Sequence, residues 1–228
     1  MSRHAEKLVE VRERIAEAAR RSGRAPDVVR LIAVSKTKPV EDIAALAQLG
    51  QRDFGENQMQ EALQKIERLE GHGLEWHFIG HLQSNKTRFI PGNFSWVHSL
   101  DSERLAARIS AAVGPADPPV NVLVQVNVFR DPAKHGVASE DLFGLLDAIL
   151  ARDLPGIRLC GLMTIGRQSG SAADTRRGFA RARALLEQCR QRFGDSFSQL
   201  SMGMSGDYKL AIEEGATMVR VGSALFGS

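Results

Sequence analysis

The sequence predicts an α/β fold, a single (β/α)₈ barrel of the TIM type with an additional N-terminal helix. Short runs of β-branched and apolar residues alternate with stretches of helical apolar spacing along the chain. Such alternation produces right-handed crossovers between parallel strands. Eight strand candidates within 228 residues suit a barrel, which takes roughly 200 to 250 residues. An open doubly wound sheet is the alternative.

The composition is that of an ordinary globular protein. Hydrophobic residues make up 43% of the chain, enough to build one full core, so we expect one domain spanning residues 1–228. The net charge of +3 is small and spread along the chain, so no nucleic-acid partner is expected. No apolar run approaches the roughly 18 residues of a membrane span, and the N-terminal segment resembles neither a signal nor a transit peptide. We therefore expect a cytoplasmic protein without membrane association.

An amphipathic helix is predicted at residues 1–24, before a barrel that occupies residues 31–227. Its apolar residues recur at spacings of three and four, and they are Leu8, Val11, Ile15 and Ala18. The pattern stops at Ser22 and Gly23, with arginines in the last turn, where cations suit the helix dipole.

The barrel elements follow in order. The predicted strands are 31–35, 52–55, 75–79, 96–99, 120–128, 158–163, 199–201 and 218–222. The predicted helices between them are 40–49, 57–70, 84–90, 102–112, 139–151, 173–193 and 206–214. Cys160 and Cys189 are the only cysteines and have no metal-ligand spacing, so both are expected to be buried as small apolar residues.

Lys36 is the most informative polar residue, because a barrel places its active site at the carboxyl ends of its strands. It follows the run Leu-Ile-Ala-Val-Ser and shares a strand face with Ile32 and Val34. Partial burial and the neighbouring Lys38 would disfavour the ammonium form, and a neutral amine can attack an aldehyde to form a Schiff base. The alternative interpretation is a surface lysine at a strand end.

A second group of candidates follows the last two strands. Arg220 is expected to point into the barrel, where a bound anion, a ring acceptor or a carboxylate from another strand would have to pair with it. Gly222 and Ser223 begin a segment that can start a helical turn, and Ser205 lies in the loop after the preceding strand. Small residues in these two loops indicate a phosphate site, although such residues are also common in loops that bind nothing.

Several other motifs do not fit a known chemistry. His77 and His81 would lie about 13 Å apart on one strand, too far to share a metal ion, and no metal site is predicted. His81 and His98 are interpreted as hydrogen-bonded residues at the barrel rim. The segment Gly203-Met-Ser-Gly-Asp207 lacks the final glycine of a hydrolase elbow.

Seven segments together resemble the pyridoxal phosphate (PLP) homeostasis protein family, whose barrel is similar to the N-terminal domain of alanine racemase. They span about 31–227, and they are AVSKTKP, FGENQMQE, WHFIGHLQSNK, HSLDS, VNVFRDPAKHG, GLMTIG and LSMGMSGDYKLAIEEGATMVRVGSALFG. One departure is Ser-Gly-Asp-Tyr-Lys at 205–209, where the family more usually has an acidic run.

The resemblance implies a set of residue roles. Lys36 would hold PLP as a Schiff base, Arg220 would lie beside the pyridine nitrogen, and Asn57 would lie near the ring. Ser205, Gly222 and Ser223 would contact the phosphate. A permanent cation beside the ring nitrogen keeps the pyridine unprotonated and weakens it as an electron sink.

Two functions are compatible with this resemblance. The favoured one is a non-catalytic protein, with no catalytic residues, that buffers PLP in the cell and delivers it, with PLP-dependent apoenzymes as candidate partners and a monomeric state. The alternative is an amino-acid racemase, which needs an acid/base group on each face of the substrate. Alanine racemases supply the second group as a tyrosine from a further domain, which is not expected here, and Tyr208 is interpreted as a helix-surface residue. A third possibility is a barrel that binds another phosphate ester.

Overall fold

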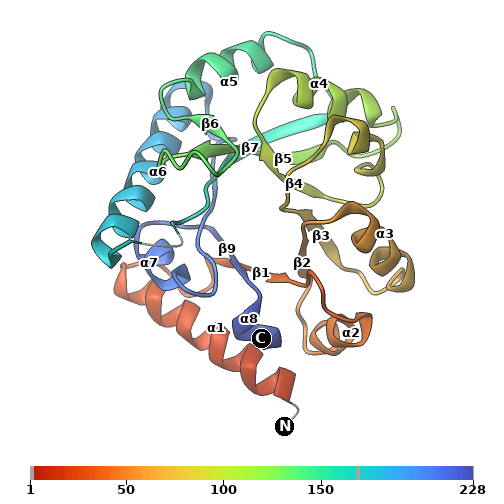
Figure 1. Cartoon of the computed structure of the whole chain (residues 1–228), viewed down its shortest axis with the longest axis vertical. Coiled ribbons are helices and arrows are strands. Elements are labelled where there is room, and N and C mark those ends of the chain that lie inside the picture. Colours follow the sequence, from red (N-terminus) through yellow and green to blue (C-terminus); the bar gives the residue numbers. More distant parts are fainter. Residues whose placement is uncertain (1–2, 168–169, 228) are drawn as a thin grey trace.

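Eight parallel strands form a closed barrel in the computed structural model, which describes residues 3–167 and 170–227 (Figure 1). They run in the order β4-β3-β2-β1-β9-β8-β7-β5, and pairing of β4 with β5 closes the barrel. Their bounds are β1 (Arg30–Val34), β2 (Asp53–Glu56), β3 (Glu75–Phe78), β4 (Trp96–Leu100), β5 (Val120–Asn127), β7 (Ile157–Met163), β8 (Gln199–Ser201) and β9 (Met218–Val221). The predicted barrel is thus confirmed, and closure excludes the open sheet.

Helices surround the barrel, with α1 placed outside α7 and α8 (Figure 1). Their bounds are α1 (Arg3–Arg21), α2 (Val40–Gln48), α3 (Met59–Arg68), α4 (Glu103–Ala112), α5 (Leu142–Leu150), α6 (Ala172–Phe193), α7 (Tyr208–Glu213) and α8 (Ser223–Phe226). Two elements differ from the prediction. The segment after β3 forms a short 3₁₀ helix, η1 (Ser84–Phe89), and a two-residue strand, β6 (Val137–Ala138), pairs with the end of β5.

The described residues form two apolar layers. The larger core lies between the helices and the outer face of the barrel, and it includes Val219 and Val221 of β9. A small cluster fills the interior, with Ile32, Trp96, Leu123, Cys160, Met163 and Met218. Cys160 and Cys189 are both buried and free, as predicted. The alternation on β9 therefore turns Arg220 inward, which also agrees with the sequence pattern.

The interpretation of Tyr208 as a surface residue is wrong. It begins α7 where α1 packs against that helix, and it is 3% exposed. Burial raises the pKa of its phenol, and Arg14 of α1 opposes that rise. Sequence periodicity could not reveal this burial, because the covering helix comes from the other end of the chain.

Gly161 on β7 is expected to be intolerant of any side chain. A Cβ atom there would lie 1.9 Å from the carbonyl oxygen of Gln199 on β8, a backbone atom that cannot move aside. Gly161→Ala should lower the free energy of unfolding by about 2–3 kcal/mol. Denaturant titration measures this loss. Gly144→Ala, on the exposed face of α5, is the matched control, because a Cβ atom there meets no atom within 4 Å. This substitution should raise the free energy of unfolding by about 0.5–1 kcal/mol. Equal stabilities of the two variants would contradict the packing argument.

Candidate functional site

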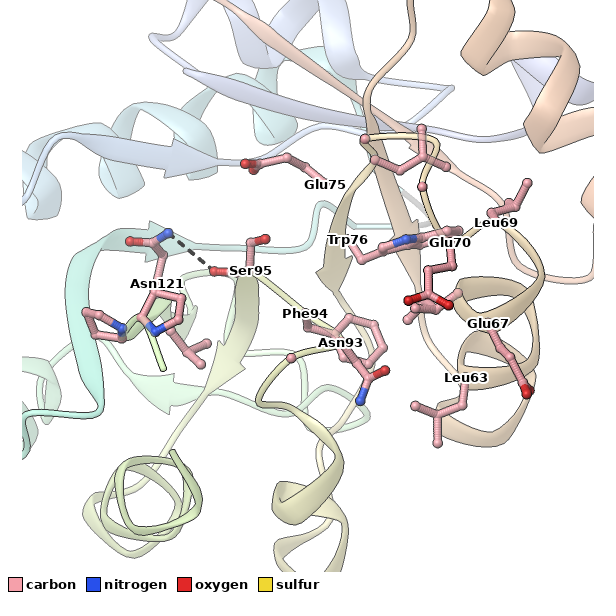
Figure 2. A pocket seen from close by; sticks show the side chains of 18 of the residues that line it. Leu63, Glu67, Leu69, Glu70, Glu75, Trp76, Asn93, Phe94, Ser95 and Asn121 are labelled. Atoms are coloured by element: carbon pink, nitrogen blue, oxygen red, sulfur yellow. Dashed lines mark hydrogen bonds between the residues drawn. The ribbon is translucent and has the colours of Figure 1, made fainter. Parts of the chain in front are cut away.

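Two of the cavities formed by the described residues lie at opposite ends of the barrel. The larger, of about 970 Å³, is at the amino ends of the strands, where Trp76 and Phe94 line it and Asn121 Nδ2 donates to the Ser95 carbonyl at 3.3 Å (Figure 2). None of the predicted site residues lines it. Because barrels bind their ligands at the carboxyl ends of the strands, size alone does not select the site.

The second cavity, of about 650 Å³, lies at the carboxyl ends of the strands, and we name it the carboxyl-end cavity. All six residues predicted to bind a cofactor line it. They are Lys36, Asn57, Ser205, Arg220, Gly222 and Ser223. These residues come from the ends of β1, β2, β8 and β9, so barrel closure brings together side chains that lie far apart in the sequence.

Lys36 lies just beyond β1 in a turn that is fixed on both sides. The Ser35 hydroxyl donates to Glu56 Oε1 at 2.6 Å, and the Thr37 amide donates to Glu61 Oε1 at 2.6 Å. Thr37 has φ +61°, a left-handed conformation that costs energy for a β-branched residue. Lys36 itself is exposed, so the predicted partial burial is wrong, although its side chain does line the cavity.

Lys65 of α3 holds this turn in place through hydrogen bonds. Its ammonium donates to the Ser35 carbonyl at 2.7 Å, to Glu56 Oε1 at 2.8 Å and to Glu61 Oε1 at 2.5 Å. The Lys65 side chain is 6% exposed and that of Glu56 is fully buried. Burial raises the pKa of Glu56 even though Lys65 and Ser35 stabilise its charged form. We call Lys65, Glu56 and Glu61 the Lys65 cluster. This cluster was not predicted from the sequence, although Glu61 and Lys65 lie four residues apart on α3.

Arg220 forms the floor of the carboxyl-end cavity. Its guanidinium donates to Ser201 Oγ at 2.7 Å and to the Thr164 carbonyl at 3.0 Å. No described carboxylate lies within ion-pair distance of it, so the predicted alternative of a direct carboxylate partner is not realised among these residues. Burial lowers the pKa of Arg220 to about 10, opposed by the nearby charge of Asp207. Arg220 therefore remains a cation at neutral pH.

A chain of buried hydrogen bonds continues from Arg220 through the barrel interior. Ser201 Oγ lies 2.9 Å from His98 Nδ1, and His98 Nε2 lies 3.0 Å from His77 Nδ1. His77 Nε2 in turn lies 3.0 Å from Asp53 Oδ1 at the amino end of the barrel. Burial lowers the pKa of both histidines, that of His98 strongly, so both imidazoles are neutral.

The order of donors along this chain follows from its two ends. The Asp53 carboxylate only accepts, so His77 donates to it through Nε2 and accepts from His98 through Nδ1. His98 then accepts the Ser201 hydroxyl proton, and Ser201 accepts from the Arg220 guanidinium. This order satisfies every member and fixes the position of the guanidinium. His98 is fully buried, so its predicted place at the rim is wrong.

Ser205 joins the two loops that follow β8 and β9. Its hydroxyl oxygen accepts the amide protons of Gly222 at 3.2 Å and Ala224 at 3.5 Å. Because the oxygen accepts both bonds, its own proton is free to donate into the cavity. A Cβ atom at Gly222 would lie 3.3 Å from the Val34 carbonyl, so a small residue suits this close approach. Ser223 follows as the first residue of α8, as predicted.

Asn57 leaves one polar atom without a partner. Its Oδ1 is buried and forms no hydrogen bond among the described residues, and the residue lines the carboxyl-end cavity. Gly80, at the neighbouring strand end, allows the backbone of Asn57 to approach, since a Cβ there would lie 2.3 Å from the Asn57 carbonyl oxygen. An unpaired buried amide oxygen is costly and fits a site that a polar ligand completes.

Four further polar residues line the carboxyl-end cavity and were not assigned to the site from the sequence. They are His81, Gln125, Lys134 and His135. Lys134 donates to the Gly166 carbonyl, and Gln125 donates to the His135 carbonyl at 2.9 Å, which ties the loop between β5 and β6 to the barrel. His81 lies at the rim as predicted, but its ring stacks on His135 and forms no hydrogen bond with another described residue, so the predicted hydrogen bond is not found. Of these four residues, only Gln125 could have been placed from the sequence, because strand alternation puts it on the inward face of β5.

Comparison with known proteins decides the family. The family described as "Alanine racemase, N-terminal domain" matches residues 7–228. The pyridoxal phosphate homeostasis protein of Pseudomonas aeruginosa is 47% identical over 228 residues, which is 100% of this chain and 96% of that protein. The protein of the same name from Escherichia coli is 42% identical, covering 98% and 96% of the two chains. The chain belongs to the pyridoxal phosphate homeostasis protein family.

Solved structures agree with this family assignment. The structure of PipY from Synechococcus elongatus with PLP bound has a TM-score of 0.85 and 37% identity, and the match covers 98% of this chain and 100% of that one. The alanine racemase of Corynebacterium glutamicum has a TM-score of 0.68 at 18% identity, and the match covers 61% of its length. The racemase likeness shows a shared fold. Among the described residues, no helix has the length and apolar character of a membrane span.

Proposed function

We propose that this protein binds pyridoxal 5'-phosphate in the carboxyl-end cavity and takes part in intracellular PLP homeostasis, buffering and delivering the cofactor without turnover of its own. This proposal rests on one observation. The exposed Lys36 amine, the buried Arg220 guanidinium and the two loops of small residues after β8 and β9 line one cavity of about 650 Å³. A relative with 37% identity has been solved with PLP bound. The unpaired Asn57 Oδ1 and the close approach at Gly222 also fit a polar ligand.

Each residue has a defined role in this proposal. Bound PLP supplies an aldehyde and an electron-withdrawing pyridine ring. The Lys36 amine would hold PLP through its aldehyde carbon, with loss of water, and the Lys65 cluster holds the turn from which Lys36 extends. Asn57 would lie beside the ring, and Ser205, Gly222 and Ser223 would contact the phosphate. Arg220 would lie beside the ring nitrogen.

Arg220 also disfavours reactions that need a protonated pyridine ring. A guanidinium with a pKa of about 10 donates hydrogen bonds and offers no proton to the ring at neutral pH. An unprotonated pyridine withdraws electrons weakly, so carbanion chemistry receives little support. The hydrogen-bonded chain to Asp53 holds the guanidinium in this orientation.

The position of Tyr208 weighs against the racemase alternative. Racemisation needs an acid/base group on each face of the substrate carbanion. Tyr208 is the only tyrosine of the chain, and it is buried between α1 and α7 rather than lining the cavity. We further propose a cytoplasmic monomer that exchanges PLP with PLP-dependent apoenzymes and has no nucleic-acid or membrane partner.

A turnover assay separates carrier from enzyme. The PLP-loaded protein is incubated with saturating L-alanine and with other L-amino acids, and chiral chromatography measures the D-enantiomer. We expect no formation above the rate with free PLP, and we expect transfer of PLP to an added apoenzyme. Sustained racemisation that is abolished in Lys36→Ala would establish the enzyme instead. A protein that develops no yellow band with PLP would support binding of a different phosphate ester.

Ser205→Ala is expected to weaken PLP binding through the phosphate. The hydroxyl proton that is free in the cavity would donate to a charged oxygen, a bond worth about 1.5–3 kcal/mol, so the affinity for PLP should fall at least tenfold. Pyridoxal, which lacks the phosphate, serves as the control and should bind equally to both proteins. Absorption titrations give the two dissociation constants, and an equal loss for PLP and pyridoxal would show that Ser205 only supports the loop.

A further inference from the structure

Three side chains able to bind a metal ion meet at the mouth of the barrel. His81 follows β3, Asp101 follows β4, and His135 lies in the loop between β5 and β6. One ligand atom from each residue lies within 4.8 Å of the ligand atoms of the other two. The ends of three neighbouring strands thus contribute two imidazole nitrogens and one carboxylate oxygen.

These three side chains have no polar partner among the described residues. Within residues 3–167 and 170–227, none of the three side chains forms a hydrogen bond or an ion pair with another described residue. The rings of His81 and His135 stack nearly parallel, with centroids 4.0 Å apart and planes inclined by 13°, so the two imidazoles already lie close together at the mouth of the barrel.

The ligand set indicates the class of metal ion. Imidazole nitrogens with one carboxylate suit Zn²⁺ and other divalent transition metals, whereas Mg²⁺ and Ca²⁺ prefer oxygen ligands alone. Bonds of about 2.0–2.1 Å around a tetrahedral ion place ligand atoms roughly 3.3 Å apart. The ligand atoms, now within 4.8 Å of one another, must therefore approach by up to about 1.5 Å, and the rings must rotate out of their stack. His81 and His135 are exposed, so such rotations are open to them.

We propose that His81, Asp101 and His135 form a binding site for one divalent transition-metal ion, with Zn²⁺ as the best match. Three protein ligands leave at least one coordination position for water, as in open zinc sites. His81 and His135 also line the carboxyl-end cavity, so the metal site adjoins the rim of that cavity. The proposal does not depend on the identity of the cofactor. The spacing of His77 and His81 within one segment gave no hint of it, because the three ligands come from separate loops.

A second cluster of the same kind does not qualify. Asp53, Glu75 and His77 also gather at the amino end of the barrel. Asp53 there already accepts from His77 at 3.0 Å, and Arg30 lies 3.4 Å from Asp53 and 3.8 Å from Glu75. Because the Arg30 guanidinium already lies beside both carboxylates and the His77 imidazole already donates to Asp53, this cluster offers no free ligands to a metal ion.

Calorimetric titration with ZnCl₂ tests the site in the full-length, tag-free protein after removal of PLP and treatment with a chelator. We expect one equivalent to bind saturably, and we expect His135→Ala and Asp101→Asn each to weaken binding at least tenfold. His72→Ala, which changes a histidine in the loop before β3 at the opposite end of the barrel, should bind as the wild type does. MgCl₂ should give no saturable binding.

Nuclear magnetic resonance of the imidazole nitrogens identifies the ligands directly. On addition of Zn²⁺, the signals of His81 and His135 should shift and those of His72 should not. The proposal is overturned if no saturable binding of Zn²⁺ occurs, or if His135→Ala and Asp101→Asn both bind as tightly as the wild type. Circular dichroism of the variants distinguishes a lost ligand from a lost fold.

Discussion

Lys65→Met is expected to lower the free energy of unfolding by about 3–5 kcal/mol at neutral pH. Methionine fills much of the same volume but leaves Glu56 as a buried carboxylate without its cation. It also removes the donor to the Ser35 carbonyl, so the turn before Lys36 loses its anchor. Denaturant unfolding measures the loss, and the same variant should load less PLP because the Lys36 amine is less well positioned.

The loss should depend on pH in a definite direction. Burial raises the pKa of Glu56 in the folded protein, so the folded state holds this proton more firmly than the unfolded chain. The stability contributed by this carboxyl is therefore fully present below its ordinary pKa and is lost as the pH rises through the raised folded pKa. Removing Lys65 raises that pKa further. The stability deficit of Lys65→Met relative to the wild type should thus shrink as the pH is lowered from neutral towards the ordinary pKa of a glutamate.

A double variant provides the control for this interpretation. Glu56→Gln removes the buried charge, so Lys65→Met/Glu56→Gln should regain a large part of the stability that Lys65→Met loses at neutral pH. Glu61, the other carboxylate of the Lys65 cluster, is partly exposed and retains access to water. A double variant no more stable than Lys65→Met would show that packing, rather than the uncompensated carboxylate, causes the loss.

Lys36→Ala is expected to abolish covalent PLP binding. The exposed Lys36 amine lines the carboxyl-end cavity, whereas the other lysine that lines it, Lys134, donates its ammonium protons to the Gly166 carbonyl. The yellow absorption band that develops when PLP is added to the wild type should be missing. Residual affinity through the phosphate contacts should remain, and equilibrium dialysis measures it.

Lys38→Ala is the matched control for Lys36→Ala. Lys38 lies two residues further along, and its ammonium donates to the Gly227 carbonyl at 2.9 Å instead of lining the cavity. The Lys38→Ala protein should therefore retain the visible band. Loss of the band in both variants, or in neither, would mean that the identity of the bonding amine has been misassigned.

Much of the barrel was predictable because its signals are local. Alternating periodicity located the eight strands to within one or two residues, and the face of β9 that carries Arg220 followed from the same alternation. The strand ends then had to meet, so Lys36 and Ser205 could be placed at one mouth. The seven segments that resemble the family supplied the chemistry that position alone could not give.

The errors involve contacts between segments that are distant in the sequence. Tyr208 is covered by α1, and His98 lies inside the barrel between His77 and Ser201. Neither contact leaves a periodic signal. The exposure of Lys36 was also unpredictable, since burial at a strand end depends on the surrounding loops. The Lys65 cluster was not predicted either, because Lys65 meets Glu56 and the Ser35 carbonyl only after α3 packs against the ends of β1 and β2.

Borohydride reduction of the PLP-loaded protein, followed by peptide mapping with mass spectrometry, identifies the amine that holds PLP. Reduction fixes PLP to that amine. We expect one pyridoxyl group per chain, on the peptide that contains Lys36. Attachment to a different lysine, or no attachment at all, would contradict the assignment of the carboxyl-end cavity as a PLP site built around Lys36.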